Sequence, residues 1–199
     1  MCASMEAHPI EEHNEAHHSA SYKALILYTL VALAIAVFVR FFIAAPYIVS
    51  GASMDPTFKS WDYLIIDRIS WQLEEPVRGD VVVFKFPQDP SRSFIKRVIG
   101  LPGETVVLSG TTVRIINDAH PEGFLLAEEY IAEENARPAH TTVTLGGDEY
   151  FVLGDNRLQS ADSRVWGNLP KELIVGRPIL RLFPFSEIEI LPGEVRYEE

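Results

Sequence analysis

The sequence has a single cysteine, Cys2, in 199 residues, which precludes an intrachain disulfide. It lacks a GxGxxG segment, a Walker-type phosphate loop and any Cys/His spacing typical of a metal site. Positive charges are also few, because 17 Lys and Arg face 28 Asp and Glu and leave a net charge of -11. We therefore expect no cofactor, no metal ion and no nucleic-acid partner.

One long apolar run does occur, over residues 24–45, with Arg40 as its only charged residue. As a helix this run would be about 33 Å long, which matches a hydrocarbon core of about 30 Å. Arg40 lies near its end, where a long side chain can reach the lipid–water interface. We expect an uncleaved transmembrane helix after a disordered tail over residues 1–23. A cleaved signal peptide is the alternative, because Ala44 and Ala45 are small.

Beyond residue 45 the pattern changes to short segments rich in Val, Ile, Phe and Tyr, separated by Gly and Pro. Such segments are typical of antiparallel sheet with hairpins. They occur at residues 63–70, 80–86, 94–100, 105–116, 149–154, 178–183 and 187–191. The sequence thus predicts a mainly β, antiparallel domain over residues 46–199, with a surface insertion of loop and short helix at about 117–147.

The segment SGASMDPTF, residues 50–58, closely follows the apolar run. Its small and turn-forming residues, Gly51 and Ala52 among them, favour a tight turn that exposes the hydroxyl of Ser53 and directs backbone N–H groups toward one point. An extended chain would keep Ser53 within about 29 Å of the membrane surface. The alternative is that this segment is only a linker.

A serine hydroxyl needs a base to act as a nucleophile. The two histidines of the β domain, His120 and His140, are isolated in the sequence, which favours a lysine instead. At a period of two, Phe94, Lys96 and Val98 share one strand face that is apolar apart from the amine. Burial on that face would lower the pKa of Lys96 toward about 7 or 8. The alternative is an edge-strand lysine whose amine reaches solvent.

Ser93 and Lys96 also have the S-x-x-K spacing of penicillin-binding proteins and β-lactamases. That motif requires a helix to bring residues i and i+3 together. The segment around Lys96 has strand composition, and in a strand these residues point to opposite faces. We therefore favour Ser53 over Ser93 as the partner of Lys96.

A third polar block, GDNRLQSADSRVWG at residues 154–167, follows a predicted strand. So many polar side chains in a short loop indicate a hydrogen-bonded network, which would either support an active site or form a solvated, well-capped loop. In this order after an apolar helix, SGASMDPT, FIKRVIGLPGE and this block resemble the sequence boxes of type I signal peptidases, the bacterial leader peptidases. The resemblance covers residues from about 24 to 185.

The resemblance implies a Ser/Lys dyad without histidine, with Ser53 as nucleophile and Lys96 as general base. It implies that Ser160 hydrogen-bonds the lysine and helps to orient it. Asp162 and Arg164 match the family's paired residues that hold the active-site loop in shape.

Two further residues of the block, Asp155 and Arg157, are expected to support the same network. Gly51 stands where some family members have a serine that donates to the oxyanion, so backbone N–H groups, including that of Ser53, would form the oxyanion hole here. On this basis Gly51→Ser is expected to leave activity intact or to raise it.

The family's substrates are exported preproteins with small residues at positions -1 and -3. The resemblance implies a bacterial plasma-membrane protein that acts as a monomer, crosses the bilayer once and has a cytoplasmic N-terminus and an extracytoplasmic catalytic domain. On this basis exposed apolar residues of VVVFKF, at residues 81–86, are expected to contact the lipid interface. Alternatives are a maturation protease with the same dyad, a self-cleaving repressor, and a catalytically inactive, membrane-tethered β module that binds export substrates.

Overall fold

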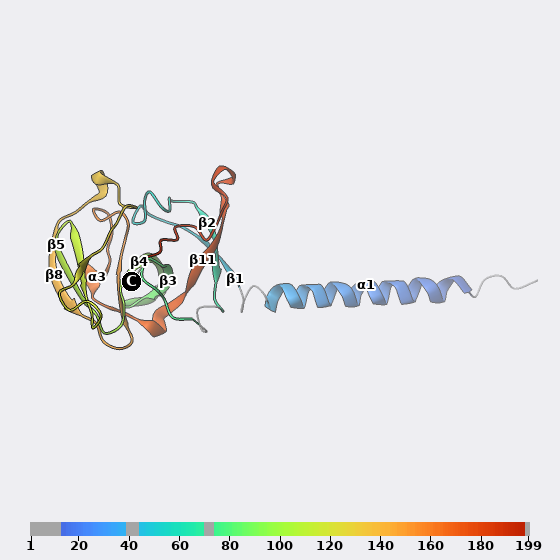
Figure 1. The fold of residues 1–199 in the computed structure, drawn as a ribbon. Coiled ribbons are helices and arrows are strands. Elements are labelled where there is room, and N and C mark those ends of the chain that lie inside the picture. The colour runs from blue at the N-terminus through green and yellow to red at the C-terminus, as the bar shows by residue number, and fades with distance from the viewer. Residues whose placement is uncertain (1–12, 39–43, 70–73, 198–199) are drawn as a thin grey trace, which may run out of the picture. The chain divides into compact units, whose positions relative to one another are not determined.

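The computed structural model describes residues 13–38, 44–69 and 74–197. Contacts divide the chain into two compact units, which separate between residues 41 and 42. The first contains a long helix, α1 (His13–Phe38), and the second contains the β-strands (Figure 1).

Helix α1 begins and ends earlier than the sequence predicted. No Gly or Pro interrupts residues 13–38, so residues 13–23, which were expected to be a disordered tail, continue the helix. The expected helix extended to Ala45, but Ala44 and Ala45 belong to a strand. Residues 1–12 of the predicted tail, and Arg40, lie outside the described residues. Among those that are described, no helix meets both the length and the apolarity that a membrane span requires.

The β unit forms two antiparallel sheets, which confirms the predicted mainly β, antiparallel domain. One sheet has the strand order β1-β2-β11-β3-β4-β9-β10, with β12 beside β11, and the other has the order β7-β6-β5-β8. The strands are β1 (Ala44–Ile48), β2 (Tyr63–Asp67), β3 (Val81–Phe86), β4 (Asp89–Gly100), β5 (Thr105–Gly110), β6 (Thr112–Ile116), β7 (Phe124–Leu125), β8 (Ala139–Thr144), β9 (Glu149–Leu153), β10 (Leu169–Pro170), β11 (Ile174–Phe183) and β12 (Glu189–Ile190). Between them lie the short helices η2 (Glu133–Asn135), α3 (Ser163–Trp166), η3 (Lys171–Leu173) and η4 (Phe185–Glu187).

Two differences from the predicted strands have local causes. The predicted β segment 105–116 divides into a hairpin of β5 and β6, because Gly110 adopts a φ of +63° and Ser109 pairs with Thr112. The predicted insertion 117–147 contains β8, which pairs with β5 along its whole length. The insertion therefore completes the second sheet.

Strands β3 and β4 lie near the centre of the larger sheet, and β3 is buried over residues 81–84 and β4 over residues 96–100. Residues 81–84 of β3 are at most 4% exposed, so the expected contact with a lipid interface is wrong for these four residues. Val82 packs in one apolar cluster with Val98 of β4, whereas Val81 and Val83 pack in another with the fully buried Met54. The strand that carries Lys96 is thus held rigidly between apolar layers.

Candidate active site

Ser53 lies in the connection between β1 and β2, in a turn fixed from both sides. The fully buried Met54 anchors the turn in the core, and the backbone N–H of Asn156 donates to the Ser53 carbonyl at 3.1 Å. Gly51 N–H donates to Ser60 Oγ at 3.0 Å, and this hydroxyl donates to the Gly51 carbonyl at 3.2 Å. The Ser53 N–H has no acceptor among the described residues, which leaves it available to a ligand.

Lys96 on β4 brings its amine to this turn. Its Nζ lies 2.8 Å from Ser53 Oγ and 2.8 Å from the Ile95 carbonyl oxygen. It also lies 5.5 Å from the centroid of the Phe94 ring. Only 3% of Lys96 is exposed, so the alternative of a lysine that reaches solvent is wrong. The structure therefore places Ser53 and Lys96 in direct contact, as the dyad hypothesis requires.

Burial is the main influence on the proton affinity of this amine. Desolvation lowers the pKa of Lys96 to about 8, while the negative charges of Asp162 and Asp155 act in the opposite direction. A fraction of the molecules therefore has a neutral, basic amine at neutral pH. Ser93, the serine of the S-x-x-K spacing, instead accepts a hydrogen bond from Lys85 Nζ at 3.3 Å.

The contact expected between Ser160 and Lys96 is not found. Ser160 Oγ is buried and has no hydrogen-bond partner among the described residues, and Lys96 makes its bonds to Ser53 and Ile95. The backbone of Gly154 packs closely against Ser160 and Ser53. A Cβ at Gly154 would lie 2.3 Å from Ser160 Oγ and 2.3 Å from the Ser53 carbonyl oxygen. Only glycine at position 154 permits the backbone to lie this close to Ser160 and Ser53, and no sequence pattern had indicated this.

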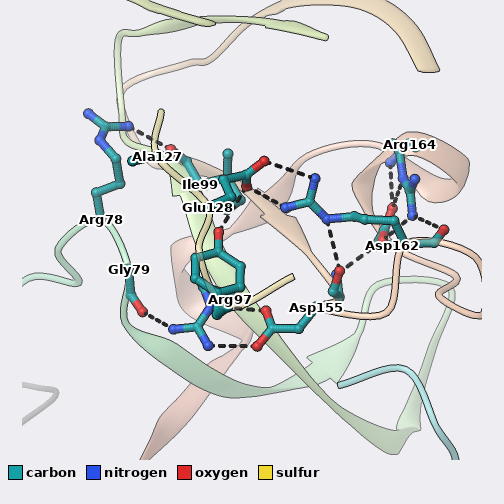
Figure 2. A network of polar contacts seen from close by, with 12 residues as sticks. Arg78, Gly79, Arg97, Ile99, Ala127, Glu128, Asp155, Asp162 and Arg164 are labelled. Atoms are coloured by element: carbon teal, nitrogen blue, oxygen red, sulfur yellow. Dashed lines mark hydrogen bonds and ion pairs between the residues drawn. The ribbon is translucent and has the colours of Figure 1, made fainter. Parts of the chain in front are cut away.

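Asp162 and Arg164 pair as expected. Arg164 donates from Nε at 2.7 Å and from Nη2 at 2.8 Å to the two carboxylate oxygens of Asp162 (Figure 2). The same carboxylate accepts the Gly154 N–H at 3.1 Å and caps α3 through the Arg164 N–H. Arg164 also donates to the Arg157 carbonyl at 2.9 Å. The pair thus fixes the loop that approaches Ser53.

Asp155 and Arg157 do not act on each other as a pair. Asp155 accepts two hydrogen bonds from Arg97, at 2.9 and 2.6 Å, and one from Thr57 Oγ1 at 2.6 Å (Figure 2). Arg157 instead forms its ion pair with Glu128. The sequence analysis did not include Arg97 in the site. Its position directly after Lys96 is the sequence feature that could have identified it.

The 117–147 segment takes part in this network and is more than the surface insertion that the sequence predicted. Glu128 accepts from the buried Arg157, and Tyr130 donates to Glu128 at 2.8 Å. Asn135 donates to the Asp55 carbonyl at 3.0 Å, and its own carbonyl accepts from Leu158 N–H at 3.2 Å. Asn135 therefore bridges the Ser53 turn and the loop after β9. No sequence pattern marks these residues.

A cleft of about 310 Å³ opens beside Ser53 and Lys96. Residues 47–53 form one wall and residues 92–96 another. Among the described strands β1 pairs only with β2, and β9 meets β4 only from Arg97 onward. Both walls therefore offer open strand edges, which can bind an extended peptide by main-chain hydrogen bonds. The part of the chain that the structure describes holds no group of His, Cys, Asp and Glu side chains placed to bind a metal ion.

Comparison with known proteins agrees with this arrangement. Residues 22–183 match the family described as "Signal peptidase, peptidase S26". A probable signal peptidase I-2 of Synechocystis sp. is 38% identical over 177 residues, which cover 85% of this chain and 77% of the relative. A probable signal peptidase I-1 of the same organism is 39% identical over 166 residues, which cover 79% of this chain and 80% of the relative.

These similarities define a hydrolase of the serine peptidase class. The chain belongs to the signal peptidase family, peptidase S26. A crystal structure of a signal peptidase I from Enterococcus faecalis is 31% identical, with a TM-score of 0.44, and covers 52% of this chain and 97% of that one.

Proposed function

We propose that this protein removes N-terminal signal peptides from exported preproteins by a Ser/Lys dyad mechanism. Ser53 is the nucleophile and Lys96 the general base. The observation that carries the proposal is the 2.8 Å contact between Lys96 Nζ and Ser53 Oγ, made by an amine with little exposure to water. Burial supplies the lowered pKa that such a base needs.

The reaction is an acyl transfer in two stages. Neutral Lys96 takes the hydroxyl proton of Ser53 while Ser53 Oγ attacks the scissile carbonyl carbon. The C–N bond then breaks, Lys96 returns the proton to the leaving amine, and an ester joins the signal peptide to Ser53. Water gives a proton to Lys96, attacks the ester and releases the signal peptide as Ser53 recovers its proton.

The oxyanion of each stage is proposed to bind the backbone N–H of Ser53. This donor has no acceptor among the described residues, and the turn that holds it is fixed by the Gly51–Ser60 and Asn156–Ser53 hydrogen bonds. A donor that is already oriented stabilises developing charge without reorganisation. Asp155, Arg157, Asp162 and Arg164 are proposed to maintain this geometry through the loop after β9.

The cleft supports the expected substrate class. Its lining includes the apolar residues Ile48, Val49 and Ile95. A volume of about 310 Å³ is at the lower end of the range for ligand sites. We propose that the substrate lies extended along the open edges of β1 and β4, with small side chains at -1 and -3 in shallow apolar pockets.

Membrane attachment is proposed from the sequence of the apolar run. Because β1 begins at Ala44, the anchor is limited to residues 24–43, which as a helix would be about 30 Å long and match the hydrocarbon core. The substrate's own apolar segment remains in the bilayer, so a tethered enzyme and its substrate meet by diffusion in two dimensions. We propose a monomeric, single-pass protein of the bacterial plasma membrane with its N-terminus in the cytoplasm.

A fluorogenic leader peptide with an Ala-x-Ala site tests the proposal on the full chain. The unmodified protein should cleave after the second Ala, whereas Ser53→Ala and Lys96→Ala should each be inactive. Ser109→Ala, at an exposed residue, and Lys171→Ala, at a half-buried one, lie outside the cleft lining and are the matched controls. Mass spectrometry of the stalled reaction should find the acyl group on Ser53.

Two outcomes would refute parts of this proposal. Cleavage that survives in Lys96→Ala would rule out the dyad. A folded protein that binds leader peptides but cleaves none would instead be the catalytically inactive β module.

A further inference from the structure

Arg92 is a second cation in the cleft, four residues before Lys96 on β4. Among the residues that line the cleft, Arg92 and Lys96 are the charged ones, and no Asp or Glu contributes to the wall. The chain as a whole carries a net charge of -11, so its general field repels acidic peptides. Any preference for an acidic substrate must therefore come from a local cation such as Arg92.

Two aromatic rings hold the guanidinium of Arg92 in place, while its N–H groups have no hydrogen-bond acceptor among the described residues. It lies 5.2 Å from the centroid of Phe94 and 6.0 Å from that of Phe86, and these rings stack with each other at 4.6 Å. It makes no hydrogen bond or ion pair within the described residues. The nearby Asp89, whose charge it feels, accepts hydrogen bonds from Ser91 N–H and Oγ. Arg92 thus keeps its N–H donors free on an aromatic support.

The direction of the substrate follows from the apolar wall. Small side chains at -1 and -3 need apolar lining, and on β4 that lining is Phe94 and Ile95, which lie on the Arg92 side of Lys96. The segment before the cut therefore extends toward Arg92. Four residues of strand span about 13 Å, which brings Arg92 opposite the substrate residues at about -4 to -6.

We propose that Arg92 is a specificity-determining residue that favours preproteins with Asp or Glu at about positions -4 to -6. The inference rests on the proposed function. An arginine beside a carboxylate at a solvent-exposed edge contributes a modest, salt-sensitive interaction. We therefore expect an acidic residue there to raise kcat/KM by about threefold over glutamine, with lysine lowering it similarly.

The experiment uses leader peptides that differ only in having Gln, Glu or Lys at -4, -5 or -6. The unmodified full chain should prefer Glu, and the preference should shrink as NaCl is added. Arg92→Gln should remove the preference and Arg92→Glu should reverse it toward Lys. Arg92→Lys keeps the charge without the planar guanidinium and should retain the preference. Arg137→Gln, an exposed residue beyond η2, removes the same charge elsewhere and should change nothing.

The outcomes separate this inference from the function on which it rests. If the Gln peptides are not cleaved at all, the proposed function fails. If they are cleaved but no position distinguishes Glu from Lys, or the preference persists in Arg92→Gln, the role of Arg92 is refuted while the peptidase proposal stands. A melting curve for each variant identifies any that fails to fold. If Arg92→Gln does not fold, a folded Arg92→Glu that prefers Lys supports the role of Arg92, and one that still prefers Glu refutes it.

Discussion

Arg97 and Asp155, which are 58 residues apart in the chain, form a two-bond ion pair in which each side chain is only 1% exposed. Arg97 also donates from Nη1 to the carbonyls of Gly79, at 2.8 Å, and Gly193, at 2.7 Å. Its guanidinium lies 4.1 Å from the centroid of Tyr130. The arginine that follows Lys96 thus joins β4, the loop after β9 and the C-terminal segment on the opposite face of the strand.

Arg97→Met should destabilise the protein by about 3–5 kcal/mol, because it leaves the carboxylate of Asp155 buried without its cation. The double variant Arg97→Met/Asp155→Leu should cost less than the sum of the two single changes. Urea unfolding of the full chain measures both. Arg196→Met, which breaks a pair whose arginine is 82% exposed, should cost less than about 0.5 kcal/mol. Equal losses for Arg97→Met and Arg196→Met would contradict the structure.

The activity should depend on pH through the amine of Lys96. With a folded-state pKa of about 8, the base is mostly protonated below that pH, so kcat/KM should fall about tenfold per pH unit on the acid side and level off above about pH 8. The measurement is a pH–rate profile with a leader peptide that has no ionisable side chains. A flat profile from about pH 6 to 9 would rule out Lys96 as the titrating base.

Lys96→Met should be inactive yet more stable than the unmodified protein at neutral pH. The pKa of Lys96 is lowered on folding from 10.5 to about 8, so below about pH 8 the folded state bears the whole cost of a buried charge, about 3 kcal/mol. Between about pH 8 and 10.5 the unfolded chain binds the proton more tightly, so the stability of the unmodified protein rises with pH. The advantage of Lys96→Met in urea unfolding should therefore shrink over that interval. If Lys96→Met is more stable by the same amount at every pH, the gain comes from packing and not from removal of a buried charge.

Gly51→Ser should lower stability and activity, contrary to the expectation drawn from the sequence. A Cβ at Gly51 meets no atom within 4 Å, but its φ of +100° is one that residues with a side chain rarely adopt. The strain should cost about 1–3 kcal/mol and shift the Ser53 turn. Gly147→Ser, where the space is equally open and φ is not in the strained range, is the matched control. Equal kcat/KM and equal stability for Gly51→Ser and the unmodified protein would show that the turn tolerates serine.

Glu128→Gln should lower the stability of the protein by loosening the loop after β9. Glu128 and Arg157 have side chains only 8% and 7% exposed, so the change leaves a buried guanidinium without its counter-charge and should cost about 2–4 kcal/mol. Because Arg157 also donates to the Gly154 carbonyl at 3.0 Å, kcat/KM should fall as well. The exposed neighbour Glu129→Gln makes the same chemical change and should leave both quantities unaltered. A loss shared by both variants would trace the effect to net charge.

Local sequence patterns predicted most of the larger sheet and the position of Lys96. The alternation of Phe94, Lys96 and Val98 specifies one strand face, and Val98 is fully buried as that pattern requires. The strand over residues 44–48 was missed because AAPYI directly follows an apolar run and continues its hydrophobicity. Strand β8 was missed because its sequence, AHTTVT, has few apolar residues and is stabilised by pairing with β5.

The sequence by itself determined most strands of the larger sheet and the strand face that carries Lys96, because side-chain alternation and β propensity act between near neighbours in the chain. Only the tertiary structure decided which charges pair. Asp155 could have met Arg157 two residues away, yet it binds Arg97, and Arg157 binds Glu128. Ion pairing depends on distance in space and on shared burial, and the chain contains many carboxylates and guanidinium groups that composition does not distinguish. The packing of β4, β9 and the 117–147 segment selects among them.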